Sequence, residues 1–274
     1  MQQVNYQYVL AEPRAVPSQK LNQYSYLSIW SKMVAGPMEK YNLKGWMSEG
    51  PFKQFVVMGE KDQQFPGHMI ANVLAQEVVV KDQKPDELWY RIGGQNHKFG
   101  KEEFALITGL RFGKINKMYM ELETKPLEEG NICLELWPNK GGSVKCEDVE
   151  KRLEERPRVK TIQAKRLLLV VMMQRLFFGL RKDATVPRFL WNMVQDLAKF
   201  KKFPWGTLIY CKTIKNLKNA ITRKIIDETK APLIKCFGWA FAVSFQINAF
   251  IYLCLHNSHF NSDFNGVEAG MVVV

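Results

Sequence analysis

The stretch FGKEEFALITGLRFG, Phe99–Gly113, contains the clearest local signal in the sequence. It places two carboxylates, Glu102 and Glu103, in the first turn of a short helix, where the helix dipole favours negative charge. Phe104 heads the apolar face, and Gly109 suits the left-handed residue that often follows a helix end. The stretch therefore predicts a packing helix with capping acids. The alternative is a catalytic role for one of the two acids.

A β-hairpin is predicted directly before this helix. The stretch ELWYRIGGQNHKFG, Glu87–Gly100, holds two short runs that meet at Gly93–Gly94, and paired glycines suit a tight hairpin turn. Further upstream, FPGHMIANVLAQEVV begins at Phe65 with Pro-Gly and has apolar residues at helical spacing. We therefore expect a helix near 66–78 before the hairpin, and one more helix over 19–34.

The remainder of the chain is predicted to be mainly helical. An irregular connection is expected over 114–142, followed by a short helix capped by Ser143. The run Leu167–Met173 is apolar all round, which is typical of a helix in the middle of a core. The predicted fold class is mainly α (α+β), a multi-helix globular domain with a small β-hairpin. Its core helices are expected near 66–78, 160–179, 187–200, 204–228 and 237–255.

The positive charge is concentrated in one segment. The chain of 274 residues has a net charge of +12, but residues 151–230 alone carry 20 Lys and Arg against 6 Asp and Glu, a net charge of +14. Clustered basic residues gain affinity for nucleic acid by releasing its counterions, so DNA or an acidic protein is the expected partner. The alternative is a solvated face that serves only solubility. No small-molecule substrate is expected.

The segment that begins FPWG at Phe203 has the clearest two-faced helical pattern. Its apolar face holds Tyr210, Ile214, Leu217, Ile221 and Ile225. The opposite face is cationic, and it is the expected place for nucleic acid, joined by lysines at the end of the preceding helix. The candidate residues for binding nucleic acid or an acidic partner are Lys199, Lys201, Lys202, Lys212, Lys215, Arg223 and Lys230.

Three aromatic residues stand among these lysines: Phe200, Phe203 and Trp205. Aromatic side chains beside basic residues could stack on the bases of a single strand. A tryptophan next to a proline in a turn is more typical of packing, and packing is the favoured interpretation.

Residues 237–255, FGWAFAVSFQINAFIYLCL, carry no charge and nearly reach the length of about 20 residues that a membrane span needs. A membrane anchor is therefore the sharpest alternative to a soluble protein. Gln246 and Asn248 would lie near the bilayer centre, where amides without partners are costly, so a buried core helix is favoured.

The cysteines and histidines predict neither a metal nor a cofactor. No CxxC pair occurs among the five cysteines, and the N-terminus lacks the pattern of a secretory signal, so an intracellular compartment with free thiols is expected. His256 and His259 lie near Cys254, but with no recognised zinc spacing. Motifs for nucleotide binding or hydrolysis are missing. A cysteine hydrolase stays open as an alternative, because its catalytic residues need only meet in space.

The sequence from Phe65 to Gly113 resembles that of a plant domain family of unknown function. The most specific parts are ELWYRIGG, KFGKEEFALITGLRFG and, later, FPWGTLIY at Phe203–Tyr210. Members of this family often stand N-terminal to cysteine peptidase modules similar to SUMO-specific proteases, in genes related to Mutator-like transposable elements. The resemblance implies a nuclear setting and a non-catalytic accessory role.

The predicted organisation is a partly ordered N-terminal extension over 1–55, the family domain over 56–255 and a flexible tail over 256–274. The protease module is not found in this sequence, so the chain is predicted not to be an enzyme and no catalytic residue is carried over. We expect a non-catalytic interaction module of a transposon-related plant protein that binds nucleic acid or an acidic protein. The alternatives are a remnant or accessory part of a SUMO-protease-like peptidase, and a membrane-anchored protein.

Overall fold

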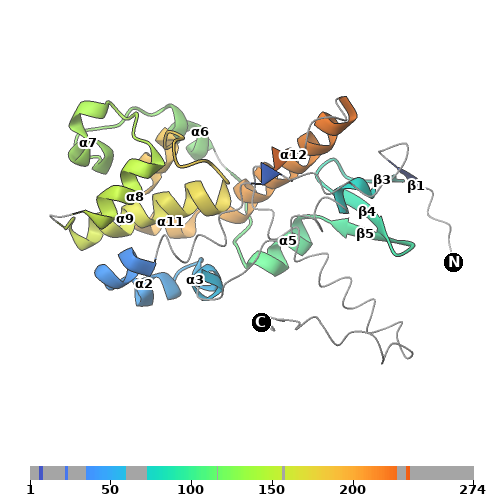
Figure 1. The fold of residues 1–274 in the computed structure, drawn as a ribbon, viewed down its shortest axis with the longest axis horizontal. Coiled ribbons are helices and arrows are strands. Elements are labelled where there is room, and N and C mark those ends of the chain that lie inside the picture. The colour runs from blue at the N-terminus through green and yellow to red at the C-terminus, as the bar shows by residue number, and fades with distance from the viewer. Residues whose placement is uncertain are drawn as a thin grey trace.

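The computed structural model describes residues 6–8, 22–23, 35–59, 73–115, 117–155, 158–226 and 233–234 of the chain (Figure 1). The labelled helices in these ranges are α2 (Lys44–Ser48), α3 (Lys53–Gly59), α5 (Lys101–Thr108), α6 (Lys117–Thr124), α7 (Ile132–Leu136), η1 (Pro138–Lys140), α8 (Cys146–Glu154), α9 (Thr161–Val171), η2 (Met172–Phe177), α10 (Arg188–Met193), α11 (Leu197–Lys202) and α12 (Trp205–Ile226), and residues 35–40 and 73–75 are helical as well. The strands are β1 (Tyr6–Tyr8), β2 (Asn22–Gln23), β3 (Glu77–Val80), β4 (Leu88–Ile92), β5 (Gln95–Phe99) and β6 (Leu233–Ile234). The predicted fold class, mainly helical with a small hairpin, is confirmed.

The hairpin belongs to an antiparallel sheet with the strand order β1-β3-β4-β5. β4 pairs with β5 along its whole length, with Leu88 opposite Phe99. Gly93 and Gly94 join the two strands with φ values of 58° and 79°. Positive φ at both turn residues is what a tight two-residue hairpin requires, so the predicted hairpin is confirmed. A second sheet pairs β2 with β6 in parallel.

The helix predicted over the quoted stretch is α5, and its acids make local contacts. Glu103 Oε2 accepts a hydrogen bond from the Gly100 N–H at 2.7 Å, and Lys98 Nζ lies 2.8 Å from Glu102 Oε2. Gly109 adopts the left-handed conformation with a φ of 58° and ends the helix. Both acids therefore serve the helix start, as the capping interpretation predicts.

The middle of the core is formed by α9 and by η2, which continues α9 as a π-helix. Every side chain from Leu167 to Met173 is at most 2% exposed, as the apolar run predicts. The π-helical turn also carries two polar side chains inward. Gln174 donates to the carbonyl oxygen of Ala184 at 2.9 Å, and Arg175 Nε lies 3.1 Å from the carboxylate of Glu150 on α8.

The same core includes apolar residues from the first part of the chain. Leu43, Met47, Phe52 and Phe55, from α2, α3 and their flanks, are buried within it. The ring of Phe55 meets that of Phe177 edge-on, with centroids 4.8 Å apart. The predicted boundary between residues 55 and 56 therefore falls within α3.

The start of α12 is joined to the loop that follows α5. The Gly206 N–H donates to the carbonyl oxygen of Arg111 at 2.9 Å. The Thr207 hydroxyl donates to the carbonyl oxygen of Gly113 at 2.9 Å and accepts from the Gly113 N–H at 3.0 Å. The two stretches that carry the family resemblance, Phe99–Gly113 and Phe203–Tyr210, therefore form one joint.

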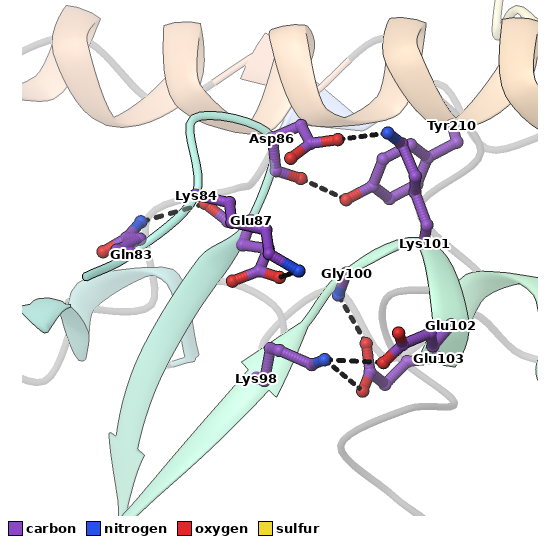
Figure 2. A network of polar contacts seen from close by, with 10 residues as sticks. All are labelled: Gln83, Lys84, Asp86, Glu87, Lys98, Gly100, Lys101, Glu102, Glu103 and Tyr210. Carbon is purple, nitrogen blue, oxygen red and sulfur yellow. Dashed lines mark hydrogen bonds and ion pairs between the residues drawn. The ribbon is translucent and has the colours of Figure 1, made fainter. Parts of the chain in front are cut away.

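Further along, α12 meets the turn before β4 (Figure 2). The Tyr210 hydroxyl and the Lys218 ammonium group donate to the backbone carbonyls of Asp86 and Pro85, respectively. The carboxylate of Asp86 pairs with Lys101, the first residue of α5, at 2.5 Å. One helix thus connects the helical part of the molecule with the sheet (Figure 1).

Several boundaries differ from the prediction because side chains act as caps. The predicted irregular connection over 114–142 is wrong, since it contains α6, α7 and η1, and the Asn131 side chain caps α7. The predicted helix over 187–200 is broken between α10 and α11, where Asp196 Oδ1 accepts from two backbone N–H groups, each at 3.0 Å. Lys145, not Ser143, is the N-cap residue of α8.

The N-terminal and C-terminal predictions are tested only in part. Residues 22–23 form strand β2, so the helix predicted over 19–34 is wrong there. In the helix predicted near 66–78, residues 73–75 are helical, but β3 begins at Glu77. The predicted helix over 237–255 and the tail over 256–274 lie outside the described residues.

Candidate nucleic-acid interface

The structure divides the candidate lysines between two helices. The last turn of α11 holds Lys199, Lys201 and Lys202. The middle of α12 holds Lys212 and Lys215, while Arg223 lies in α12 with its side chain outside the described part, and Lys230 lies outside it altogether.

The two-faced pattern of α12 is confirmed where side chains are described. Tyr210, Ile214 and Leu217 are at most 6% exposed, and Lys215 is exposed. Ile221 and Ile225 lie where side chains are not described.

Lys212 packs against the core. Its ammonium group lies 5.0 Å from the ring centroid of Phe178, and the side chain is half-buried. Burial lowers the pKa of Lys212, the negative charge of Glu123 raises it, and the positive charge of Lys215 lowers it. The ammonium group of Lys212 is therefore less accessible to a partner than that of a fully solvated lysine.

The three lysines of α11 differ in their surroundings. Lys199 is exposed and lies 3.5 Å from the carboxylate of Asp196, the cap of the same helix. Lys202 is exposed and makes no ion pair with any described carboxylate. All three ammonium groups also suit the negative end of the helix dipole. Of the three, Lys202 is the most open to a partner.

The aromatic residues among these lysines are core residues. Phe200, Phe203 and Trp205 are at most 3% exposed, and the Trp205 indole N–H donates to the carbonyl oxygen of Phe200 at 2.7 Å. Both phenylalanine rings lie 4.6 Å from the Trp205 ring, centroid to centroid. The packing interpretation is confirmed, and these rings present no face on which a base could stack.

Lys201 belongs to a cluster that the sequence analysis missed. Its Nζ lies 5.2 Å from the ring centroid of Trp46 on α2, and Nζ of Lys165 on α9 lies 5.1 Å from the same centroid. These are distances at which a cation is attracted to an aromatic ring. We call Trp46, Lys165 and Lys201 the basic tryptophan cluster. No local pattern could have revealed it, because its members come from three separate elements.

The described cysteines lack the electrostatics of an activated nucleophile, which needs a lowered thiol pKa. Burial raises the pKa of Cys133 to about 11, and burial with the nearby Glu150 charge raises that of Cys146. Burial also raises the pKa of Cys211. Cys236 and Cys254 lie outside the described residues, as do His256 and His259.

Within the part of the chain that the structure describes, no group of three or more His, Cys, Asp or Glu side chains could hold a metal ion. Among the same residues, no helix has the length and apolar character needed to cross a membrane. The segment 237–255 lies outside the described residues.

The chain matches a protein family but no individual curated protein or solved structure. A family profile described as Domain of unknown function (DUF1985) matches residues 74–216. The matched residues run from just before β3 into α12 and include both stretches of the joint between α5 and α12. Because the match spans more than half of the 274 residues, the chain belongs to the DUF1985 family of domains of unknown function.

Proposed function

We propose that this domain is a non-catalytic interaction module that binds nucleic acid through lysines of α9, α11 and α12. The observation that carries the proposal is that the positive charge of residues 151–230 is not neutralised from within the segment. Lys202 and Lys215 are exposed and make no ion pair with any described carboxylate. Such lysines can exchange counterions for phosphates.

The acids of the same segment offer little compensation. Asp183 pairs with Arg181 and Asp196 with Lys199, so each of these acids is engaged by a close neighbour in the chain. Since Arg175 also pairs with Glu150 from outside the segment, the charge that a partner meets is that of the exposed basic residues, such as Lys202 and Lys215. Resemblance to domains encoded beside SUMO-protease-like modules supports a nuclear, transposon-related plant protein as the setting.

Binding of fluorescently labelled DNA, followed by anisotropy, tests the proposal. Single-stranded and duplex DNA of equal length are titrated at about 50 and about 200 mM salt. We expect binding at low salt that weakens steeply at high salt, because phosphate contacts release counterions. Absence of binding to either DNA at low salt would reject the proposal.

Charge variants locate the interface. The double variant Lys202→Gln/Lys215→Gln is expected to bind more weakly and with a smaller salt dependence. The matched control is Lys81→Gln/Lys114→Gln, which removes the same charge from two exposed lysines outside residues 151–230. Equal losses in both variants would contradict a localised interface. Stronger binding of polyglutamate than of DNA would replace nucleic acid by an acidic protein as the partner.

A further inference from the structure

We propose that the basic tryptophan cluster is a phosphate-binding subsite, and this inference rests on the proposed function for its nucleic-acid ligand. Trp46 on α2, Lys165 on α9 and Lys201 on α11 meet at one place on the surface. Because both ammonium groups lie about 5 Å from one ring centroid, they are at most about 10 Å from each other. Two positive charges within about 10 Å of each other both attract an anion that lies beside them.

The cluster has no counter-charge of its own. Among the described residues, neither Lys165 nor Lys201 has a carboxylate within ion-pair distance, and neither donates a hydrogen bond. Glu49, the acid nearest to Trp46 in the chain, pairs with neither lysine. The Trp46 indole N–H likewise donates to no described group. The cluster thus offers donors of positive or partly positive charge that no described acceptor uses.

The lysine side chains are held in place before any ligand arrives. Both are half-buried, and the ring of Trp46 attracts both ammonium groups. A Cβ atom at Gly50 would lie 4.0 Å from Cε of Lys201, so this stem packs along the end of α2. Ordering a lysine on binding normally costs affinity, and side chains already ordered lose less.

The chemistry of these donors favours a phosphate group. Ammonium groups bind phosphate oxygens as point charges, and an indole N–H can donate to a further oxygen. Lys202 follows Lys201 directly on α11 and is exposed, which extends the positive surface for a neighbouring phosphate of the same strand. A nucleic-acid backbone supplies such consecutive phosphates.

Variants of the cluster test its contribution to DNA affinity. Lys165→Gln/Lys201→Gln is expected to lower the slope of log K against log salt by about 2, since each phosphate-binding lysine contributes about 1. Trp46→Leu keeps both lysines but removes the aromatic ring that attracts them, and a loss of DNA affinity of about threefold to tenfold is expected. The control, Lys151→Gln/Lys182→Gln, removes two exposed lysines of the same basic segment. An equal change of slope in the control would overturn the subsite while leaving the proposed function intact.

Lysine footprinting on the unmodified protein tests the subsite without relying on variants that could fail to fold. Acetylation of each lysine is measured by mass spectrometry with no ligand, with single-stranded DNA and with inorganic phosphate. Protection of Lys165 and Lys201 beyond that of Lys151 and Lys182 by DNA supports a backbone subsite. Protection by inorganic phosphate alone supports a site for free phosphate and contradicts a nucleic-acid backbone as the ligand of this cluster, while the proposed function is still decided by the Lys202 and Lys215 variants. If neither ligand selectively protects Lys165 and Lys201, the inference is overturned.

Discussion

A Cβ atom added at Gly206 would lie 2.6 Å from Cδ2 of Phe112. The same atom would lie 2.8 Å from the carbonyl oxygen of Arg111, which accepts the Gly206 N–H. Real Cβ atoms do not approach other atoms this closely, so only glycine lets α12 begin against the loop after α5. The backbone contact between the two family stretches therefore depends on the absence of a side chain at one position.

Replacement of Gly206 by alanine is expected to destabilise the domain. Overpacking costs about 1–3 kcal/mol, which outweighs the gain of up to about 1 kcal/mol that alanine brings to a helix. Urea unfolding followed by tryptophan fluorescence measures the change. Gly45→Ala is the control, because Gly45 lies within α2 with no atom within 4 Å of the added Cβ, and it is expected to be neutral or stabilising. A stable Gly206→Ala variant would contradict the contact.

The buried Glu77 on β3 predicts a fall in stability with rising pH. Burial raises the pKa of Glu77 from 4.5 to about 7, although the positive charge of Lys218 acts in the opposite direction. Between these two values the folded state binds a proton that the unfolded state has released, so the free energy of unfolding decreases as pH rises. The loss amounts to about 3 kcal/mol and is complete above the folded pKa.

The variant Glu77→Gln isolates this effect. Burial lowers the pKa of His97 on β5, which makes stability rise with pH over part of the same window, so only the difference between wild type and variant is informative. Urea unfolding at pH 5 and pH 8 is expected to show the variant gaining stability relative to wild type at the higher pH. Parallel pH profiles would show that Glu77 is ionised in the folded protein.

The hydroxyl of Tyr210 is expected to contribute more to the stability of the fold than the nearby carboxylate of Asp86. Burial raises the pKa of Tyr210, followed in effect by the charge of Asp86, so the phenol keeps its proton and donates to the Asp86 carbonyl. Tyr210→Phe is expected to cost about 1 kcal/mol. Asp86→Asn breaks only the partly exposed ion pair with Lys101 and is expected to cost about 0.5 kcal/mol or less. Thermal unfolding compares the two, and the reverse order would contradict this account.

The ion pair of Arg175 and Glu150 is expected to be costly to break from one side. Arg175 is 6% exposed, and burial raises the pKa of Glu150, while the Arg175 charge lowers it. Arg175→Met leaves the half-buried carboxylate of Glu150 without its cation, and a loss of about 3 kcal/mol, the lower end for a buried pair, is expected. The double variant Glu150→Met/Arg175→Met should recover much of that loss, because an apolar pair needs no compensation. Equal unfolding free energies for single and double variants would argue against coupling.

The elements with strong local signals could be predicted from the sequence. The Gly93–Gly94 pair fixes a hairpin turn, Gly109 ends α5, and the all-round apolar run places α9 in the core. The apolar face of α12 follows from residues three or four positions apart, such as Tyr210 and Ile214. Each of these signals acts within a few residues of the structure that it determines.

The missed features depend on side-chain caps or on distant contacts. α7 has only five residues, too few for a helical period, and it depends on the Asn131 cap. Asp196 breaks a segment whose apolar spacing alone predicts one helix. The basic tryptophan cluster joins Trp46 to lysines more than 100 residues away in the chain, so no spacing rule applies to it. For the same reason, the sequence could nominate Lys212 but not its contact with Phe178.

The continuity of α12 also restricts how related genes can change in length. Gly206 fits the loop after α5, and Lys218 reaches the turn before β4, about 18 Å farther along one uninterrupted helix. One inserted residue between them would rotate everything beyond it by about 100° and carry Lys218 away from the sheet. Evolutionary insertions and deletions should therefore collect in surface loops such as 125–130, while the interval from Gly206 to Lys218 keeps a constant number of codons.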